Sequence, residues 1–377
     1  MCRSIPMRKV FIVLVIFSVF GTAAYGQRSK VIAAFQLIEN EKYKEAKTAI
    51  EEATHDAKTR GWTRTWYARG LLAQQAYEKG MKDNDKKKYE LYPDQLYVAY
   101  DSYRKSLLFD RNGRMNDVVA PMYVQLANDF LKVGEKHYKS EDYDEALRAF
   151  EHALEINKSP ILTIDLDTNL LYNAALSAYQ AKEWEKATQY LSELNDFRYS
   201  SNIPHLLNTV YLAQGDSTTA EQVLAEGVER YDYEKDLVLL YVDLLFQEDA
   251  VGNAVAILDS AAVNDTVNAV FFYTKGLIYQ KAEHYNKAIL AYERTVEADP
   301  EKIEAYSNIA TCYYNMAVEI EEQARKITNM RLYRSERVKS DAARKSAVTW
   351  LERAYEMDPL NQDVREQLNQ LNQFLRK

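Results

Sequence analysis

The chain has 377 residues, with few glycines (11) and prolines (7) and many tyrosines (29). Architectures built from β-strands need Gly and Pro at their many turns, so this composition disfavours them and favours an all-α fold. The formal net charge is −8 and no basic stripe runs along the chain, which argues against nucleic acid as a partner.

Residues 1–26 have the pattern of a secretory signal peptide. A positively charged start precedes the eleven-residue segment from Val10 to Phe20, which is apolar except for Ser18, and small side chains at Ala24 and Gly26 precede Gln27. The apolar run is shorter than the roughly 20 residues that a membrane-spanning helix needs. We therefore expect an exported protein that lies in the periplasm, associates with the outer membrane or is secreted. A buried N-terminal helix is the alternative.

The mature chain, from Gln27 onwards, offers neither a disulfide nor a transmembrane segment. Cys312 is its only cysteine, so no intramolecular disulfide can form. No later stretch is apolar for long enough to cross a membrane. Stability must therefore come from buried apolar surface. Removal of the signal peptide takes away three positive charges and moves the formal net charge from −8 to −11.

A pattern based on alanine recurs along the mature chain. Each leading Ala is followed four residues later by a large apolar residue and, in most cases, three residues after that by a small one. Successive leading alanines lie 53, 47, 41, 33, 34, 34 and 59 residues apart, and the run 33, 34, 34 indicates tandem units of about 34 residues. The leading alanines are Ala46, Ala99, Ala146, Ala187, Ala220, Ala254, Ala288 and Ala347.

A second half-pattern precedes each leading alanine. In the seventh unit it reads Phe272, Gly276 and Tyr279, and Pro300 closes the unit. These residues resemble the tetratricopeptide repeat, a 34-residue helix–turn–helix unit. The resemblance implies an all-α, right-handed α-solenoid of about eight tandem helix–turn–helix repeats. In each repeat, small residues sit where the two helices cross, because only small side chains let the helices approach closely.

The spacing divides residues 27–361 into eight repeat units. Residues 115–126 and 160–167 are expected to be longer connections between units. Residues 362–377, with apolar side chains three or four positions apart, are expected to form the C-terminal capping helix that a solenoid requires. The units are 27–60, 61–114, 127–160, 168–201, 202–234, 235–268, 269–302 and 303–361.

Two units carry insertions between the small residue of the first helix and the leading alanine of the second, near 80–96 and 318–342. The ordinary spacing is 12 residues, but it is 29 in the second unit and 37 in the last. Because the last insertion contains no Gly or Pro, both of its helices are expected to lengthen and project as a hairpin. Both insertions are locally basic, which suits either a solvated helix or contact with an anionic membrane or an acidic partner.

No catalytic motif appears in the sequence. The five histidines form no pair at a metal-binding spacing, and neither a glycine-rich phosphate loop nor a nucleophile elbow is present. Cys312 falls on the apolar face of a first helix, which favours a packing role over a nucleophile. The sequence therefore predicts no enzyme, no cofactor and no metal, and an unrecognised enzyme is the least favoured alternative.

The inner face of the first helices is the candidate binding surface. In tetratricopeptide repeats these helices line a concave groove, so the resemblance implies that their inner side chains meet a partner. Here that face is aromatic and amide-rich, which suits peptide binding, although the tyrosines could instead pack between repeats. Lys and Arg, which clamp a C-terminal carboxylate in one subtype, are missing from it. The candidate groove residues are Tyr67, Asn128, Tyr138, Asn169, Tyr172, Tyr179, His205, Phe246, Tyr273 and Tyr314.

The sequence thus favours a non-catalytic scaffold or adaptor of the cell envelope that binds a protein or peptide through an aromatic-lined groove. The alternative is a structural scaffold that self-associates through the projecting hairpin 311–346, a segment that could equally form a peripheral membrane contact. The fold does not name the partner, because repeat folds host many different ligands.

Overall fold

The computed structural model describes residue 26, residues 28–375 and the side chains as far as residue 373. The predicted signal peptide, except Gly26, and its cleavage point therefore lie outside the described residues. The chain forms two compact units, each made of several repeats: the first unit is Met1–Phe197 and the second is Arg198–Lys377. A single helical hairpin within them is called a repeat. Every regular element of the described residues is a helix, which confirms the predicted all-α fold of tandem helical hairpins.

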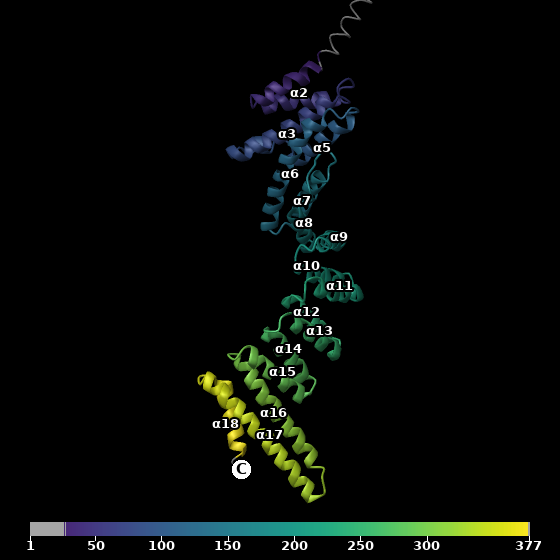
Figure 1. Ribbon diagram of the computed structural model, residues 1–377. Coiled ribbons are helices and arrows are strands. Elements are labelled where there is room, and N and C mark those ends of the chain that lie inside the picture. Colours follow the sequence, from purple (N-terminus) through teal and green to yellow (C-terminus); the bar gives the residue numbers. More distant parts are fainter. Residues whose placement is uncertain (1–25, 27, 376–377) are drawn as a thin grey trace, which may run out of the picture. The chain divides into compact units, whose positions relative to one another are not determined.

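The first unit begins with a helical segment over 28–39, and its helices then pair into hairpins (Figure 1). Helix α3 packs on α5, α6 on α7, and α8 on α9. Residues 158–167, none of which is helical, join α7 to α8 and include the expected connection 160–167. The helices are α2 (Tyr43–His55), α3 (Thr63–Asp83), α4 (Lys86–Tyr89), α5 (Gln95–Phe109), α6 (Asn116–Lys139), α7 (Tyr143–Asn157), α8 (Thr168–Gln180) and α9 (Trp184–Asp196).

The second unit continues the same scheme and ends in a capping helix. Helix α10 pairs with α11, α12 with α13, α14 with α15, and α16 with α17, while α18 packs on α17. The helices are α10 (Asn202–Ala213), α11 (Ser217–Arg230), α12 (Lys235–Gln247), α13 (Val251–Asn264), α14 (Ala269–Lys281), α15 (Tyr285–Ala298), α16 (Ile303–Ala324), α17 (Met330–Met357) and α18 (Gln362–Leu375).

Small residues at the helix crossings hold each hairpin together. All eight leading alanines of the sequence pattern are 0% exposed, as a crossing position requires. In the α6–α7 hairpin the ring of Phe150 lies directly over Gly134, where an added Cβ would come within 2.5 Å of the ring. In the α14–α15 hairpin a Cβ on Gly276 would overlap the ring of Tyr292 in the same way. The small residue therefore admits the large aromatic side chain of the second helix into the crossing.

The expectation that residues 115–126 form a connection is wrong. All but the first of them belong to α6, which continues through Pro121 in its second turn. Val119, Tyr123 and Leu126 stand four and three residues apart and are 0, 3 and 0% exposed. This buried stripe on one helix face outweighs the hydrogen bond that proline cannot donate.

The two insertions have different structures. In the first insertion α3 is lengthened to 21 residues, and the chain then folds back through the short helix α4. In the last repeat both helices are long, with 22 residues in α16 and 28 in α17. The insertion near 318–342 falls on these two helices and on the turn between them. The capping helix α18 follows α17 after the short connection 358–361.

Candidate functional site

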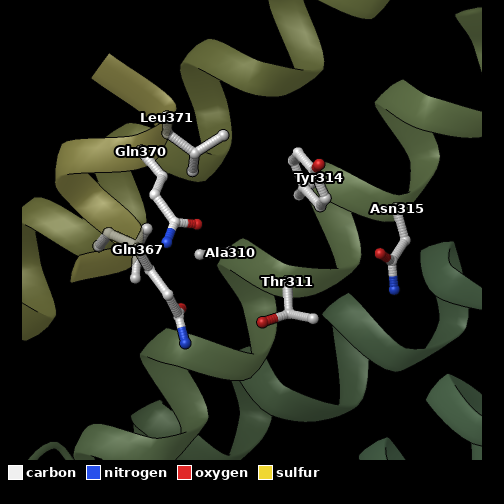
Figure 2. A pocket seen from close by; sticks show the side chains of 8 residues that line it. Ala310, Thr311, Tyr314, Asn315, Gln367, Gln370 and Leu371 are labelled. Carbon is white, nitrogen blue, oxygen red and sulfur yellow. The ribbon is translucent and has the colours of Figure 1, made fainter. Parts of the chain in front are cut away.

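A cleft of about 470 Å³ opens between α16 and the capping helix α18 (Figure 2). Its apolar floor comes from three different helices: Ala310 of α16, Leu351 of α17 and Leu371 of α18 are 1, 1 and 8% exposed. The cleft thus combines an apolar floor with hydroxyl and amide groups along its rim, the usual composition of a ligand site. The rim residues are Thr311, Tyr314, Asn315, Gln367 and Gln370.

The amphipathic sequence of α18 explains how its glutamines reach the cleft. Val364 and Leu371, with Leu368 between them, pack into the cluster formed by α16 and α17. Gln367 and Gln370 each precede one of these apolar residues, so they lie beside the packed stripe, and both are exposed. Figure 2 shows them facing the first helix of the last hairpin across the cleft.

Tyr314 is the most exposed of the candidate groove aromatics, with 43% of its surface accessible. It lies on α16 one residue before Asn315, and both border the cleft. A large exposed aromatic side chain beside amide groups can cover a peptide while its hydroxyl still finds a polar partner.

Tyr273 and Phe246 lie half-buried on neighbouring first helices of the same unit. The hydroxyl of Tyr273 accepts a hydrogen bond of 3.1 Å from Nδ2 of Asn308, which joins α14 to α16. The ammonium of Lys302 lies 5.0 Å from the centre of the Tyr273 ring, and that of Lys281 lies 4.7 Å from the centre of the Phe246 ring. Each ring is thus covered in part by a cation of its own unit.

His205 is exposed on α10, apart from these aromatic residues. It borders a smaller cleft of about 300 Å³ between α10 and α12, with Asn202, Asp236 and Leu240. Two carboxylates, Glu234 and Asp236, border this cleft, whereas the lining of the cleft beside Tyr314 contains no charged side chain.

In the first unit the structure brings Tyr138 and Tyr172 together. Burial raises the pKa of Tyr138, and the neighbouring hydroxyls of Tyr143 and Tyr172 raise it further. The rings of Tyr138 and Tyr143 meet edge to face at 5.3 Å. Tyr179 lies seven residues after Tyr172 on the same face of α8, with its ring 6.0 Å from that of Trp184. All of these side chains are half-buried, so each has one side packed and one side accessible.

Tyr67 has a different setting from the other candidate tyrosines. Its ring lies 6.0 Å from that of Phe35 and 5.9 Å from that of Tyr103, and burial raises its pKa. Tyr67 therefore packs between neighbouring hairpins. Asn128 on α6 and Asn169 in the first turn of α8 are exposed.

Two family models of the tetratricopeptide repeat match residues 132–198 and 269–302. These two stretches of the chain are tetratricopeptide repeats. The first match runs from α6 to the end of α9, and the second covers α14 and α15. They include the helices that carry Tyr138, Tyr172, Tyr179 and Tyr273. The repeats indicate a protein–protein interaction scaffold.

Solved structures of tetratricopeptide repeat proteins are similar to the chain at low identity. A TPR repeats protein from Bacteroides fragilis NCTC 9343 is 18% identical, with 66% of this chain and 98% of that chain covered and a TM-score of 0.37. The C-terminal part of a TPR repeat-containing protein from Cytophaga hutchinsonii is 15% identical, with 63% and 98% covered and a TM-score of 0.39. The TPR2AB domain of yeast Sti1, in complex with pHSP90, is 17% identical, with 67% and 99% covered and a TM-score of 0.26. No curated protein matches the chain.

Two groups of residues near the candidate binding surface are absent from the sequence-predicted site. Gln367 and Gln370 were assigned only to a capping helix, although the amide-rich composition of that helix signals a polar surface. On α14, Val270 and Leu277 are 40 and 42% exposed and share one face with Tyr273, three and four residues away. Apolar side chains exposed along one face of a helix are typical of a contact surface.

Cys312 lies in a buried apolar cluster with Ile289, Tyr292 and Ile309. It is 0% exposed, and burial raises the pKa of its thiol to about 12, so the thiol stays protonated at neutral pH. Among the described residues, no group of three His, Cys, Asp or Glu side chains is placed to hold a metal ion. None of the described helices is both long and apolar enough to span a membrane.

Proposed function

We propose that the protein is a non-catalytic scaffold of the cell envelope that binds an extended segment of another protein along the inner face of its first helices. The observation that carries this proposal is the cleft beside Tyr314. It joins an exposed aromatic ring and four further polar rim residues to a floor of three buried apolar side chains.

The chemistry of the rim suits a peptide backbone. Each Asn or Gln side chain offers two N–H donors and an accepting oxygen, and an extended peptide presents N–H and C=O groups in alternation. The apolar floor can take up a side chain of the bound segment, and Tyr314 can cover it. Tyr has only two side-chain torsions to fix, so it contributes contact area at a low entropic cost.

The bound segment is internal rather than a free C-terminus. Capture of a terminal carboxylate needs Lys or Arg directed at it, because a carboxylate is recognised by charge-assisted hydrogen bonds. The equivalent positions of the first unit carry uncharged or acidic side chains: Tyr67, Leu71, Leu131, Glu135, Tyr172 and Leu176. In the second unit Lys281 and Lys302 lie over aromatic rings.

A photo-crosslinking experiment tests the binding face directly. A benzophenone amino acid placed at Tyr314 or Tyr172 should give a light-dependent adduct with one segment of a partner protein in cells. The matched control is the same amino acid at Leu290, which is 63% exposed on the second helix α15. Adducts that form equally well at Leu290, or only there, would contradict groove binding.

The envelope location rests on the N-terminal sequence alone. The segment 1–26 supports export, and a periplasmic, outer-membrane-associated or secreted protein follows from it. Mass spectrometry of the mature protein should then find Gln27 as its first residue. A mature protein that still carries Val10–Phe20 would rule out this processing.

A further inference from the structure

The far end of the α16–α17 hairpin, residues 325–339, is a second surface that the groove does not use; we call it the hairpin tip. Helices α16 and α17 have 22 and 28 residues, whereas α14 and α15 have 13 and 14. At 1.5 Å per residue, α17 is about 42 Å long. The turn between α16 and α17 therefore lies beyond the neighbouring hairpin of the same unit (Figure 1).

The hairpin tip is strongly basic in an acidic chain. It contains six Lys or Arg residues and one Glu, while the whole chain has a formal net charge of −8. Glu321 and Glu336 neutralise part of this charge through ion pairs with neighbouring basic residues. Lys326, Arg331 and Arg334 are exposed and form no ion pair with another residue of the described chain. These three cations are available to an anionic partner.

The tip also exposes large apolar side chains among the basic ones. Met330, Leu332 and Val338 are 62, 56 and 68% exposed. Asn329 caps α17: its Oδ1 accepts hydrogen bonds from the backbone N–H groups of Arg331 and Leu332, at 3.0 and 3.2 Å. The cap fixes the first turn of α17, so the apolar and basic side chains of that turn are presented from a rigid end.

We propose that the hairpin tip docks end-on to the surface of an anionic phospholipid bilayer. Lys326, Arg331 and Arg334 would meet the lipid phosphates, while Met330 and Leu332 would enter the boundary between headgroups and acyl chains. The positive charge of the tip complements the negative charge of the lipid headgroups. The exposed apolar side chains add a contribution to the affinity that salt does not screen. The rest of the chain is acidic and is repelled by the same surface, which orients the molecule tip first.

A second copy of the chain fits the tip less well. Two tips brought together would place uncompensated cations against each other, and like charges oppose such a contact. A bilayer supplies both the anions and the apolar layer that the tip requires. Self-association is therefore an outcome that the test must separate from lipid binding.

Cosedimentation of the mature protein with vesicles tests the proposal. The protein should sediment with vesicles of phosphatidylcholine and phosphatidylglycerol, and not with phosphatidylcholine alone. Arg331→Glu/Arg334→Glu should lower the partition coefficient by at least about tenfold. The matched control Lys345→Glu/Arg365→Glu makes the same change in net charge at exposed sites outside the tip, and should alter partitioning by no more than about twofold.

The apolar contribution is measured with Met330→Ser/Leu332→Ser. This variant keeps every charge and should lose the part of the binding that persists at high salt. All of these positions are exposed, so melting followed by circular dichroism should be unchanged. Three results would overturn the proposal: no sedimentation of the wild-type protein with anionic vesicles, equal losses in the tip and control variants, or a lipid-free dimer that the tip substitutions dissociate.

Discussion

In the second repeat the inserted residues fold back against α3, whereas in the last repeat they lengthen α16 and α17 into a long hairpin. In the first case Leu91 and Tyr92 are buried, at 9 and 5% exposure. Gln95 holds the returning chain, because its Nε2 donates to the backbone oxygens of Ala73 and Lys88 at 2.8 and 3.1 Å. This insertion enlarges the core of its own repeat.

The hairpin of the last repeat is held by a buried polar cluster instead. The side chain of Arg344 is 2% exposed and pairs with Glu321 across the hairpin. Its Nη1 donates to Ser340 at 2.7 Å, and Ser340 donates to the backbone oxygen of Ala317 at 2.9 Å. The cluster fixes the register of two helices that present their far end to solvent. An insertion that returns to the core adds stability, whereas one that leaves it adds a new surface.

The largest expected effect of any change to these insertions is at Glu321. Glu321→Ala removes the carboxylate nearest to the buried Arg344 guanidinium and leaves only that of Asp341, which lies 3.6 Å from Nη1, so the free energy of unfolding of the hairpin should fall by about 3 kcal/mol. Hydrogen exchange of the α16 and α17 amides measures this loss. Glu319→Ala removes an exposed carboxylate from the same helix and should change stability by less than about 0.5 kcal/mol. Equal effects at the two positions would exclude the ion pair as the element that holds the hairpin.

A smaller effect is expected where the first insertion returns to α3. Gly80 lies against the backbone of α4, and an added Cβ would overlap the backbone nitrogen of Tyr89 and lie 2.9 Å from the oxygen of Asp85. Gly80→Ala should therefore destabilise the unit by about 1–2 kcal/mol in thermal unfolding. Gly252→Ala, in a helix with open space around the Cβ position, should instead stabilise by up to about 1 kcal/mol. If both substitutions stabilised, α4 would not pack closely on α3.

The two regions that carry the insertions should also respond to pH with opposite signs. The lengthened α3 brings Glu78 beside Asp129 of α6, and burial, followed by the charge of Asp129, raises the pKa of Glu78. Burial also raises the pKa of Asp129, which is 5% exposed. A carboxyl group with a raised pKa in the folded state loses stability as the pH rises from its unfolded pKa through its folded pKa. At Glu321 the hydrogen bond from Arg344 lowers the pKa, so the hairpin loses stability as the pH falls instead.

The smallest expected effect follows from this pair of carboxyl groups. Asp129→Asn removes the buried charge but keeps an accepting oxygen for Gln125, so it should raise stability at pH 7 by about 1 kcal/mol. It should also flatten the loss of stability between acid and neutral pH. Asp101→Asn, at an exposed position on α5, serves as control and should change stability by less than about 0.5 kcal/mol. An Asp129→Asn profile identical to the wild type would show that these carboxyl groups do not share a buried site.

The repeat architecture could be predicted from the sequence because one physical constraint recurs. A crossing of two helices admits only a small side chain, so a leading alanine stands at the crossing of every repeat. All of these alanines are fully buried. The helical extension over 115–126 was missed because repeat spacing was given more weight than the stripe formed by Val119, Tyr123 and Leu126. The fold-back of the first insertion depends on contacts such as that of Gln95 with Ala73, which no local pattern predicts.

The candidate site could be predicted only in part. The repeat register assigns Tyr314 and Tyr273 to first helices, and the structure has them on α16 and α14. Register does not show how much of a side chain its neighbours cover. Tyr67 demonstrates this, because Phe35 of the preceding helical segment and Tyr103 of its own hairpin both lie beside its ring. The cleft itself needs α18 to return beside α16, which is a property of tertiary packing.

The central claim is that the exposed face of the first helices binds a partner segment. Its most direct test is to measure melting temperature and partner affinity for Tyr314→Ala and Tyr292→Ala, with the crosslinked segment as the peptide. Tyr314 is 43% exposed, so its loss should leave melting nearly unchanged and weaken binding about thirtyfold. Tyr292 is 0% exposed, and its loss should lower the free energy of unfolding by about 3–5 kcal/mol. Early melting of Tyr314→Ala, or full affinity without this side chain, would contradict the account.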